Sequence, residues 1–131
     1  MLKTHKLSSS SNSYIQNGTS YAYVDASTTS FEFLSKDITL VTSPLGLTLH
    51  PLYAGSAELS FMYNDETPDN KTSSSYGHTK GVIAANGTEG FWLIHSVPSF
   101  PPEPDDGYSY PSSGLRYAQS FLCLSLSLFL F

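Results

Sequence analysis

A histidine and a lysine stand two residues apart in the segment Gly77-His78-Thr79-Lys80-Gly81. In an extended chain alternate side chains point to the same face, so His78 and Lys80 can act on one substrate group. An imidazole can attack phosphorus as a nucleophile, and an ammonium group can neutralise the charge that builds on the non-bridging oxygens. The segment therefore predicts chemistry on a phosphodiester. The alternative is a solvated strand edge, because the same spacing also arises by chance.

Four other side chains have structural interpretations. His95 ends an aromatic run and precedes a proline-rich loop, which predicts a histidine that hydrogen-bonds this loop. Phe91 and Trp92 can stack on bases, but neighbouring strand residues face opposite ways, so at least one of them is expected in the core. The core is the default expectation for both. His50 precedes a proline and is also interpreted as structural.

Apolar, aromatic and β-branched runs predict the strands that position these residues. The runs are residues 21–24, 31–34, 38–41, 59–63, 82–85 and 91–94, with Leu45, Leu47 and Leu49 alternating after a predicted turn at residues 43–46. Asn86-Gly87 lies between two of the runs and is the dipeptide most typical of tight hairpins. The sequence therefore predicts a hairpin that joins residues 82–85 to 91–94.

The remaining segments are predicted to be loops, a short helix and a last strand. Residues 64–75 are polar and indicate a surface loop, and residues 97–104 hold four prolines and indicate an irregular one. Leu115, Ala118 and Leu122 recur with helical spacing after Ser112-Ser113. Residues 121–131 carry no charge but are too short to span a bilayer. We expect them to form a strand whose partner lies further on, in a larger fold.

Composition indicates a globular chain. The 131 residues are 40% hydrophobic and 14% aromatic, which fits one domain and excludes a disordered protein. Residues 1–20 are rich in Ser and Asn and are predicted to be a flexible N-terminal segment, with the domain at residues 21–131. The single cysteine, Cys123, excludes an internal disulfide and a cysteine-based zinc site.

Charge favours acidic conditions for any nucleic-acid partner. The formal net charge is −5 at pH 7, which repels polyanions. Protonation of the four histidines brings it to −1 before any carboxylate titrates. The first residues lack the apolar core of a secretory signal, whereas three sequons, at Asn17, Asn70 and Asn86, point towards a secreted glycoprotein.

Several strings in the chain together resemble the deoxyribonuclease II family. They are GHTKGV, GFWLIHSVPSFPP, YSYP, YAQSFLC, HPLY and FMYND, and the resemblance runs from about residue 6 to residue 125. It implies the N-terminal half of such an enzyme. The implied fold class is α/β, a mixed β-sheet with few helices, which forms one half of a phospholipase D-like pseudo-dimer. Residues 21–131 would then be a partial domain, the first pseudo-repeat.

The resemblance also implies a reaction. Family members are acid endonucleases of lysosomes or secretions that hydrolyse DNA without a metal or other cofactor, through a phosphohistidine, to 3′-phosphate products. His78 matches the first-half catalytic histidine, Lys80 its paired lysine, and His95 the histidine after the aromatic strand, in a supporting role. The implied partner is a DNA substrate, with no membrane.

Three family features are absent from the sequence: a signal peptide, an N-terminal cysteine and a second His-x-Lys pair. A complete site would therefore require a homodimer or a missing C-terminal half. Cys123 matches a family cysteine for which the resemblance implies a disulfide partner outside this sequence. The alternative function is a truncated, non-catalytic protein of the family that binds DNA or another partner.

Overall fold

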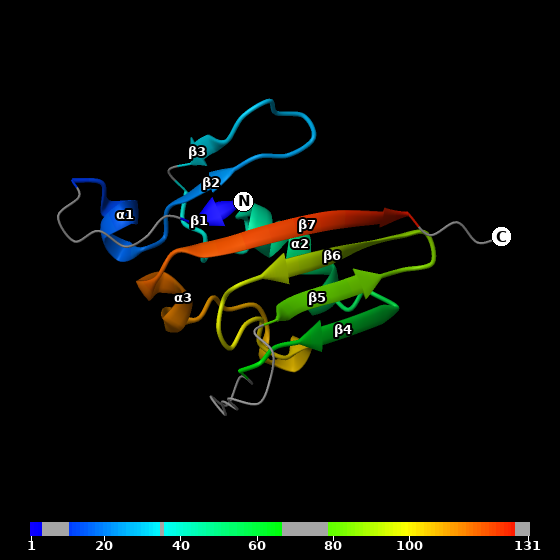
Figure 1. Ribbon diagram of the computed structural model, residues 1–131. Coiled ribbons are helices and arrows are strands. Elements are labelled where there is room, and N and C mark those ends of the chain that lie inside the picture. Colours follow the sequence, from blue (N-terminus) through cyan, green and yellow to red (C-terminus); the bar gives the residue numbers. More distant parts are fainter. Residues whose placement is uncertain (4–10, 35, 67–78, 128–131) are drawn as a thin grey trace.

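The computed structural model of the chain describes residues 1–3, 11–34, 36–66 and 79–127. A seven-stranded sheet in the order β3-β2-β1-β7-β6-β5-β4 forms its centre, and all neighbouring strands are antiparallel (Figure 1). The strands are β1 (Leu2–Lys3), β2 (Tyr21–Tyr23), β3 (Glu32–Leu34), β4 (Leu59–Tyr63), β5 (Lys80–Ala85), β6 (Glu89–His95) and β7 (Gln119–Ser127). The helices are α1 (Ser13–Asn17), α2 (Pro44–Tyr53), α3 (Ser112–Arg116) and the 3-10 turn η1 (Pro104–Asp106). The predicted α/β class with few helices is confirmed.

The hairpin of β5 and β6 is confirmed, but its turn lies one residue further along than the Asn-Gly dipeptide predicts. The Asn86 N–H donates to the Glu89 carbonyl at 2.9 Å, so Gly87 and Thr88 form the turn. The Asn86 side-chain oxygen accepts from the Thr88 and Glu89 N–H groups, both at 2.9 Å. An Asx turn of this kind satisfies the backbone locally and fixes the register of the two strands.

Residues 44–53 form a helix, so the predicted turn at residues 43–46 and the extended interpretation of the following leucines were wrong. Ser43 caps this helix, because its Oγ accepts from the Gly46 N–H at 3.1 Å. The same Oγ donates to the Ile38 carbonyl at 3.0 Å. Pro44 occupies the first turn, where its missing N–H costs nothing.

Burial on α2 follows the helical period. Leu45, Leu49 and Leu52 are buried, whereas Leu47 is 60% exposed. The spacings of four and three place the buried leucines on one stripe, which packs behind the sheet (Figure 1). The alternation of leucines at residues 45–49 covers only five residues, which is too short to distinguish a helix from a strand.

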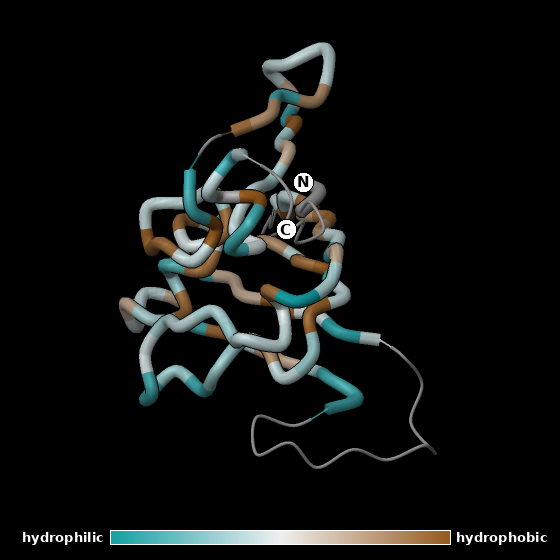
Figure 2. The backbone as a smooth tube through the Cα atoms, turned by 90° about the vertical axis from the view of Figure 1, so that its left-hand side faces the viewer, coloured by the Kyte–Doolittle hydropathy of each residue, from teal (hydrophilic) through white to brown (hydrophobic). Residues whose placement is uncertain are grey.

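The strands predicted at residues 21–24 and 31–34 pair with each other as β2 and β3. The connection between them projects from the rest of the molecule in both views (Figures 1 and 2). Residues 38–41 form turns, so the strand predicted there was wrong. Ile38 is nevertheless fully buried, and its carbonyl accepts from the hydroxyl groups of Ser43 and Tyr108.

The short helix predicted after Ser112-Ser113 is confirmed, but it ends at Arg116, and Leu122 lies in β7. The last strand is also confirmed, but the prediction that its partner lies beyond the chain was wrong. Residues 119–120 pair with β1 and residues 121–127 pair with β6, so β7 is central in the sheet. The first twenty residues include β1 (Leu2–Lys3) and α1 (Ser13–Asn17), and the domain division at residue 20 stays a prediction.

The two faces of the sheet differ. The inner face packs Val82 and Leu93 against α2, in a core that also holds Tyr21, Ile38, Val97, Phe100 and Phe121. The outer face of β4–β7 carries no charged residue, and its side chains Leu59, Phe61, Trp92, Leu122 and Leu124 are exposed. Trp92 was expected in the core and instead lies on this outer face, where its Nε1–H donates to the Tyr63 hydroxyl at 3.0 Å.

In the part of the chain that the structure describes, no helix has both the length and the apolar character needed to cross a membrane.

Candidate active site

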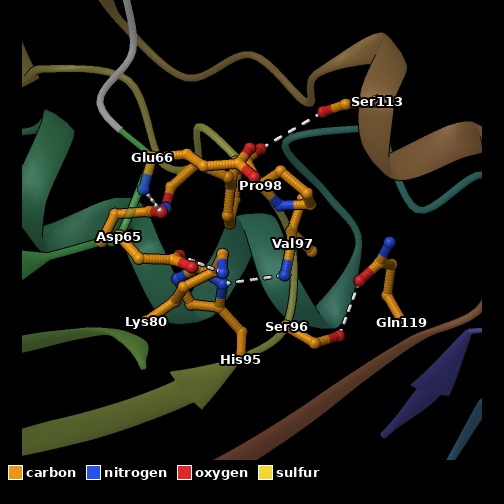
Figure 3. Close-up of polar contacts among 11 residues, drawn as sticks. Asp65, Glu66, Lys80, His95, Ser96, Val97, Pro98, Ser113 and Gln119 are labelled. Atoms are coloured by element: carbon orange, nitrogen blue, oxygen red, sulfur yellow. Dashed lines mark hydrogen bonds and ion pairs between the residues drawn. The ribbon is translucent and has the colours of Figure 1, made fainter. Parts of the chain in front are cut away.

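Lys80 begins β5 and is paired in register with His95, the last residue of β6. Its side chain points to the inner face and is only 7% exposed, and its ammonium group forms an ion pair with the Asp65 carboxylate, which is 5% exposed. Figure 3 shows the three side chains gathered at this end of the sheet. A cation, a carboxylate and an imidazole thus share one buried site.

His95 is packed between two aromatic rings. Its ring centroid lies 5.4 Å from that of Phe100, edge-on, and 6.3 Å from that of Phe121. The Val97 N–H donates to His95 Nδ1 at 3.2 Å. Because Nδ1 accepts a hydrogen bond, the neutral ring carries its proton on Nε2. Nε2 is buried and has no hydrogen-bond partner among the described residues.

The surroundings of His95 disfavour its charged form. Burial among the aromatic rings, and secondly the positive charge of Lys80, lower the pKa of His95 from 6.5 to about 4. His95 is therefore neutral at pH 5. A neutral imidazole with a protonated Nε2 can donate a hydrogen bond but cannot supply a proton to a leaving group.

The His-Ser-Val-Pro stretch connects three elements at this end of the sheet. Ser96 Oγ donates to Gln119 Oε1 at 2.6 Å and accepts from the Ser120 N–H at 3.0 Å. Val97 is fully buried, and the Pro98 carbonyl accepts from the Ser113 hydroxyl at 3.2 Å (Figure 3). The stretch therefore fixes the end of β6 to the start of β7 and to α3. The irregular loop predicted at residues 97–104 is confirmed.

The structure brings together two of the three predicted site residues, Lys80 and His95. His78 lies outside the described residues. Thr79 precedes β5 and is exposed. At Gly81 strand packing leaves no room for a side chain, because a Cβ there would lie 2.7 Å from the Leu93 carbonyl and would collide with the Tyr63 ring on the outer face.

Asp65 is the site residue that the sequence interpretation missed. It lies within residues 64–75, which were predicted to form a surface loop, yet it is buried. Its neighbour Asn64 donates to the Phe100 carbonyl at 2.9 Å and so fastens this segment to the proline-rich loop. The available signal was an acidic residue two positions after a predicted strand, in the FMYND string. Residues 67–75 lie outside the described residues.

Among the described residues, no group of three or more His, Cys, Asp or Glu side chains could hold a metal ion. The candidate site instead contains one cation, one carboxylate and one imidazole. This set can bind and orient a phosphate group by charge and hydrogen bonds.

The fold and the site define an α/β protein with a buried lysine and histidine at one end of an antiparallel sheet, and the comparisons with known proteins agree on one family. The family model of deoxyribonuclease II matches residues 3–130. Rattus norvegicus deoxyribonuclease-2-beta is 44% identical over 114 residues, which cover 83% of this chain and 32% of that protein. Homo sapiens deoxyribonuclease-2-beta and Sus scrofa deoxyribonuclease-2-alpha are each 41% identical, over 84% and 86% of this chain and 32% of each relative. The chain belongs to the deoxyribonuclease II family, and it spans about a third of the length of these relatives.

Proposed function

We propose that this chain supplies one half of the active site of an acid endodeoxyribonuclease of the deoxyribonuclease II type. The observation that carries the proposal is the pairing of Lys80 with His95 across β5 and β6. Lys80 follows His78 by two residues in the sequence, and the chain belongs to the deoxyribonuclease II family. A buried cation beside a hydrogen-bond donor is suited to a phosphate group.

In this proposal the reaction proceeds through a phosphohistidine and needs no metal or other cofactor. A ring nitrogen of His78 attacks phosphorus, the bond from phosphorus to the 5′-oxygen breaks, and this oxygen takes a proton from a second histidine. Water then hydrolyses the phosphorus–nitrogen bond. The products are a 3′-phosphate and a 5′-hydroxyl, with His78 regenerated. Lys80 neutralises the charge on the non-bridging oxygens.

His95 supports this chemistry without exchanging a proton. It is neutral at pH 5 because burial and the charge of Lys80 hold its pKa at about 4. Its buried Nε2–H has no partner among the described residues and is free to donate to a phosphate oxygen. Its Nδ1 holds the Val97 N–H of the proline-rich loop, which fits the supporting role.

The protonated second histidine must come from outside this half-site. We propose two sources: a second copy of the chain, which makes a homodimer, or a C-terminal half of the protein that is not in this sequence. The pseudo-dimer architecture belongs to the same proposal. Loss of a general acid typically slows a reaction by about 10² to 10⁴-fold, so one isolated half is expected to be nearly inactive.

The proposed localisation is lysosomal or secreted, and the proposed substrate is DNA. The charge balance supports acidity, because protonation of the three histidines other than His95 changes the formal net charge from −5 to −2. Glycans at the sequons of Asn17, Asn70 and Asn86 are part of this proposal.

The alternative function is a non-catalytic family member that binds DNA or another partner. The Lys80–His95 pair supports it, because a single pair of this kind can bind a phosphate without cleaving it. It predicts binding without turnover.

Plasmid nicking at pH 5 in excess EDTA tests the proposal. The purified chain is compared over a range of concentrations with His78→Ala and with the matched control His50→Ala, which changes an exposed histidine on α2. We expect nicking that survives EDTA, disappears in His78→Ala and persists in the control. A steep rise with concentration would identify the homodimer. Binding without nicking at any concentration would contradict activity of this chain and favour the alternative.

A further inference from the structure

We propose that Asp65 is a positioning residue of this half-site, which holds the Lys80 ammonium opposite His95 and competes with the substrate phosphate for it. The inference deepens the proposed function and rests on it. Asp65 comes from the segment after β4, and Lys80 begins β5, so the contact joins two separate elements (Figure 3).

The burial of both partners requires the contact. The side chains of Lys80 and Asp65 are 7% and 5% exposed, and a charge at such depth is stable only beside an opposite charge. Asp65 therefore determines where the flexible four-carbon side chain of Lys80 ends. An ammonium group has three donors, and those that Asp65 does not use can reach a phosphate oxygen.

The Lys80–Asp65 pair also sets the charge that the site presents to a substrate. The carboxylate cancels the ammonium charge and the adjacent His95 is neutral at pH 5, so these three groups together carry no net charge before substrate binds. An incoming phosphate must share Lys80 with Asp65. Removal of the carboxylate should therefore make phosphate binding tighter and leave the ammonium group misplaced for catalysis.

Asp65→Asn tests the inference, with Glu66→Gln as the matched control. The control removes the same charge one residue further along, from a half-buried side chain. The first readout is the rate at which an amine-acetylating reagent modifies Lys80, measured by peptide mass spectrometry relative to the exposed Lys36. We expect Lys80 to react about tenfold faster in Asp65→Asn and at the unchanged rate in Glu66→Gln.

The second readout is the affinity for a fluorescent oligonucleotide at low salt, measured in the His78→Ala background so that turnover cannot interfere. Asp65→Asn should bind several-fold more tightly and, with His78 restored, nick DNA at least tenfold more slowly. A residue needed only for folding would weaken both binding and nicking. Asp65→Glu keeps the charge, so it should keep Lys80 protected while nicking slows. If Asp65→Asn does not fold, the acetylation rate of Lys80 and the nicking rate of Asp65→Glu test the role of Asp65 instead.

An unchanged acetylation rate of Lys80 in Asp65→Asn, or weaker oligonucleotide binding, would overturn the role of Asp65. Neither measurement requires cleavage. If the unsubstituted chain does not nick DNA but both binding and acetylation change as expected, the positioning role stands while the proposed activity of this chain fails.

Discussion

Lys80 and His95 face each other as register partners across β5 and β6, and the ammonium group that pairs with Asp65 also helps to lower the pKa of His95. The imidazole and the lysine therefore cannot be treated as separate groups. Burial keeps His95 neutral, the neutral ring leaves Lys80 without a competing cation, and the carboxylate keeps Lys80 in place.

Acid should destabilise the chain through His95. Its pKa is about 4 in the folded chain and 6.5 as the ordinary value, so the unfolded chain takes up the proton first. The free energy of unfolding is therefore unaffected by this histidine above pH 6.5 and decreases as the pH falls from 6.5 through 4. The total decrease from this one group is about 3 kcal/mol. Urea unfolding between pH 7 and 4 should show a smaller loss in His95→Gln than in the unsubstituted chain. Equal losses would contradict this, and His50→Gln is the control.

Lys80→Met should destabilise the chain as well as abolish the proposed nicking of DNA. The substitution leaves the Asp65 carboxylate buried without its counter-ion, and breaking a buried pair costs about 3–5 kcal/mol. The double variant Lys80→Met/Asp65→Leu should regain most of this free energy of unfolding while remaining inactive. Lys36→Met, at an exposed position, should stay within about 0.5 kcal/mol. A stable single variant with an unstable double variant would refute the pairing.

Ser43→Ala should weaken α2. The Ser43 hydroxyl accepts from the Gly46 N–H and donates to the Ile38 carbonyl, and all three groups are in the buried interior. Loss of a helix cap costs about 0.5–2 kcal/mol, whereas the Ile38 carbonyl keeps a second donor, the Tyr108 hydroxyl at 3.3 Å. The exposed Ser112 makes no cap hydrogen bond for α3, so Ser112→Ala is the control in thermal unfolding. Equal melting temperatures for both variants would contradict the role of Ser43.

Gly81→Ala should be costly, whereas Gly87→Ala should not. A Cβ at Gly81 would lie 2.7 Å from the Leu93 carbonyl, and it would also meet the Tyr63 ring. Forced overpacking of this kind costs about 1–3 kcal/mol. A Cβ at Gly87 meets only the Glu58 side chain, at 3.8 Å. Chemical denaturation of the two variants checks the difference. A Gly81→Ala chain as stable as Gly87→Ala would show that β4 and β5 pack less closely than the structure indicates.

The sequence by itself determined the elements around the site. Compact apolar runs predicted β4, β5 and β6, and the prolines at residues 98–104 predicted the irregular loop. Apolar patterns gave a wrong prediction where a few residues fit both the strand period and the helix period. The leucines at 45, 47 and 49 alternate as in a strand, but the Ser43 cap and the packing of α2 on the sheet select the helix.

Only the tertiary structure decided which residues meet. A two-residue turn at Asn86-Gly87 would pair Lys80 with Leu93, whereas the Asx turn made by the Asn86 side chain moves the register by two residues and places His95 opposite Lys80. Asp65 completes the group from a segment with no regular pattern. An unpaired charge is unstable in the buried interior, so the buried Lys80 ammonium group requires the Asp65 carboxylate beside it. The residues next to Lys80 in the sequence do not indicate which carboxylate this is.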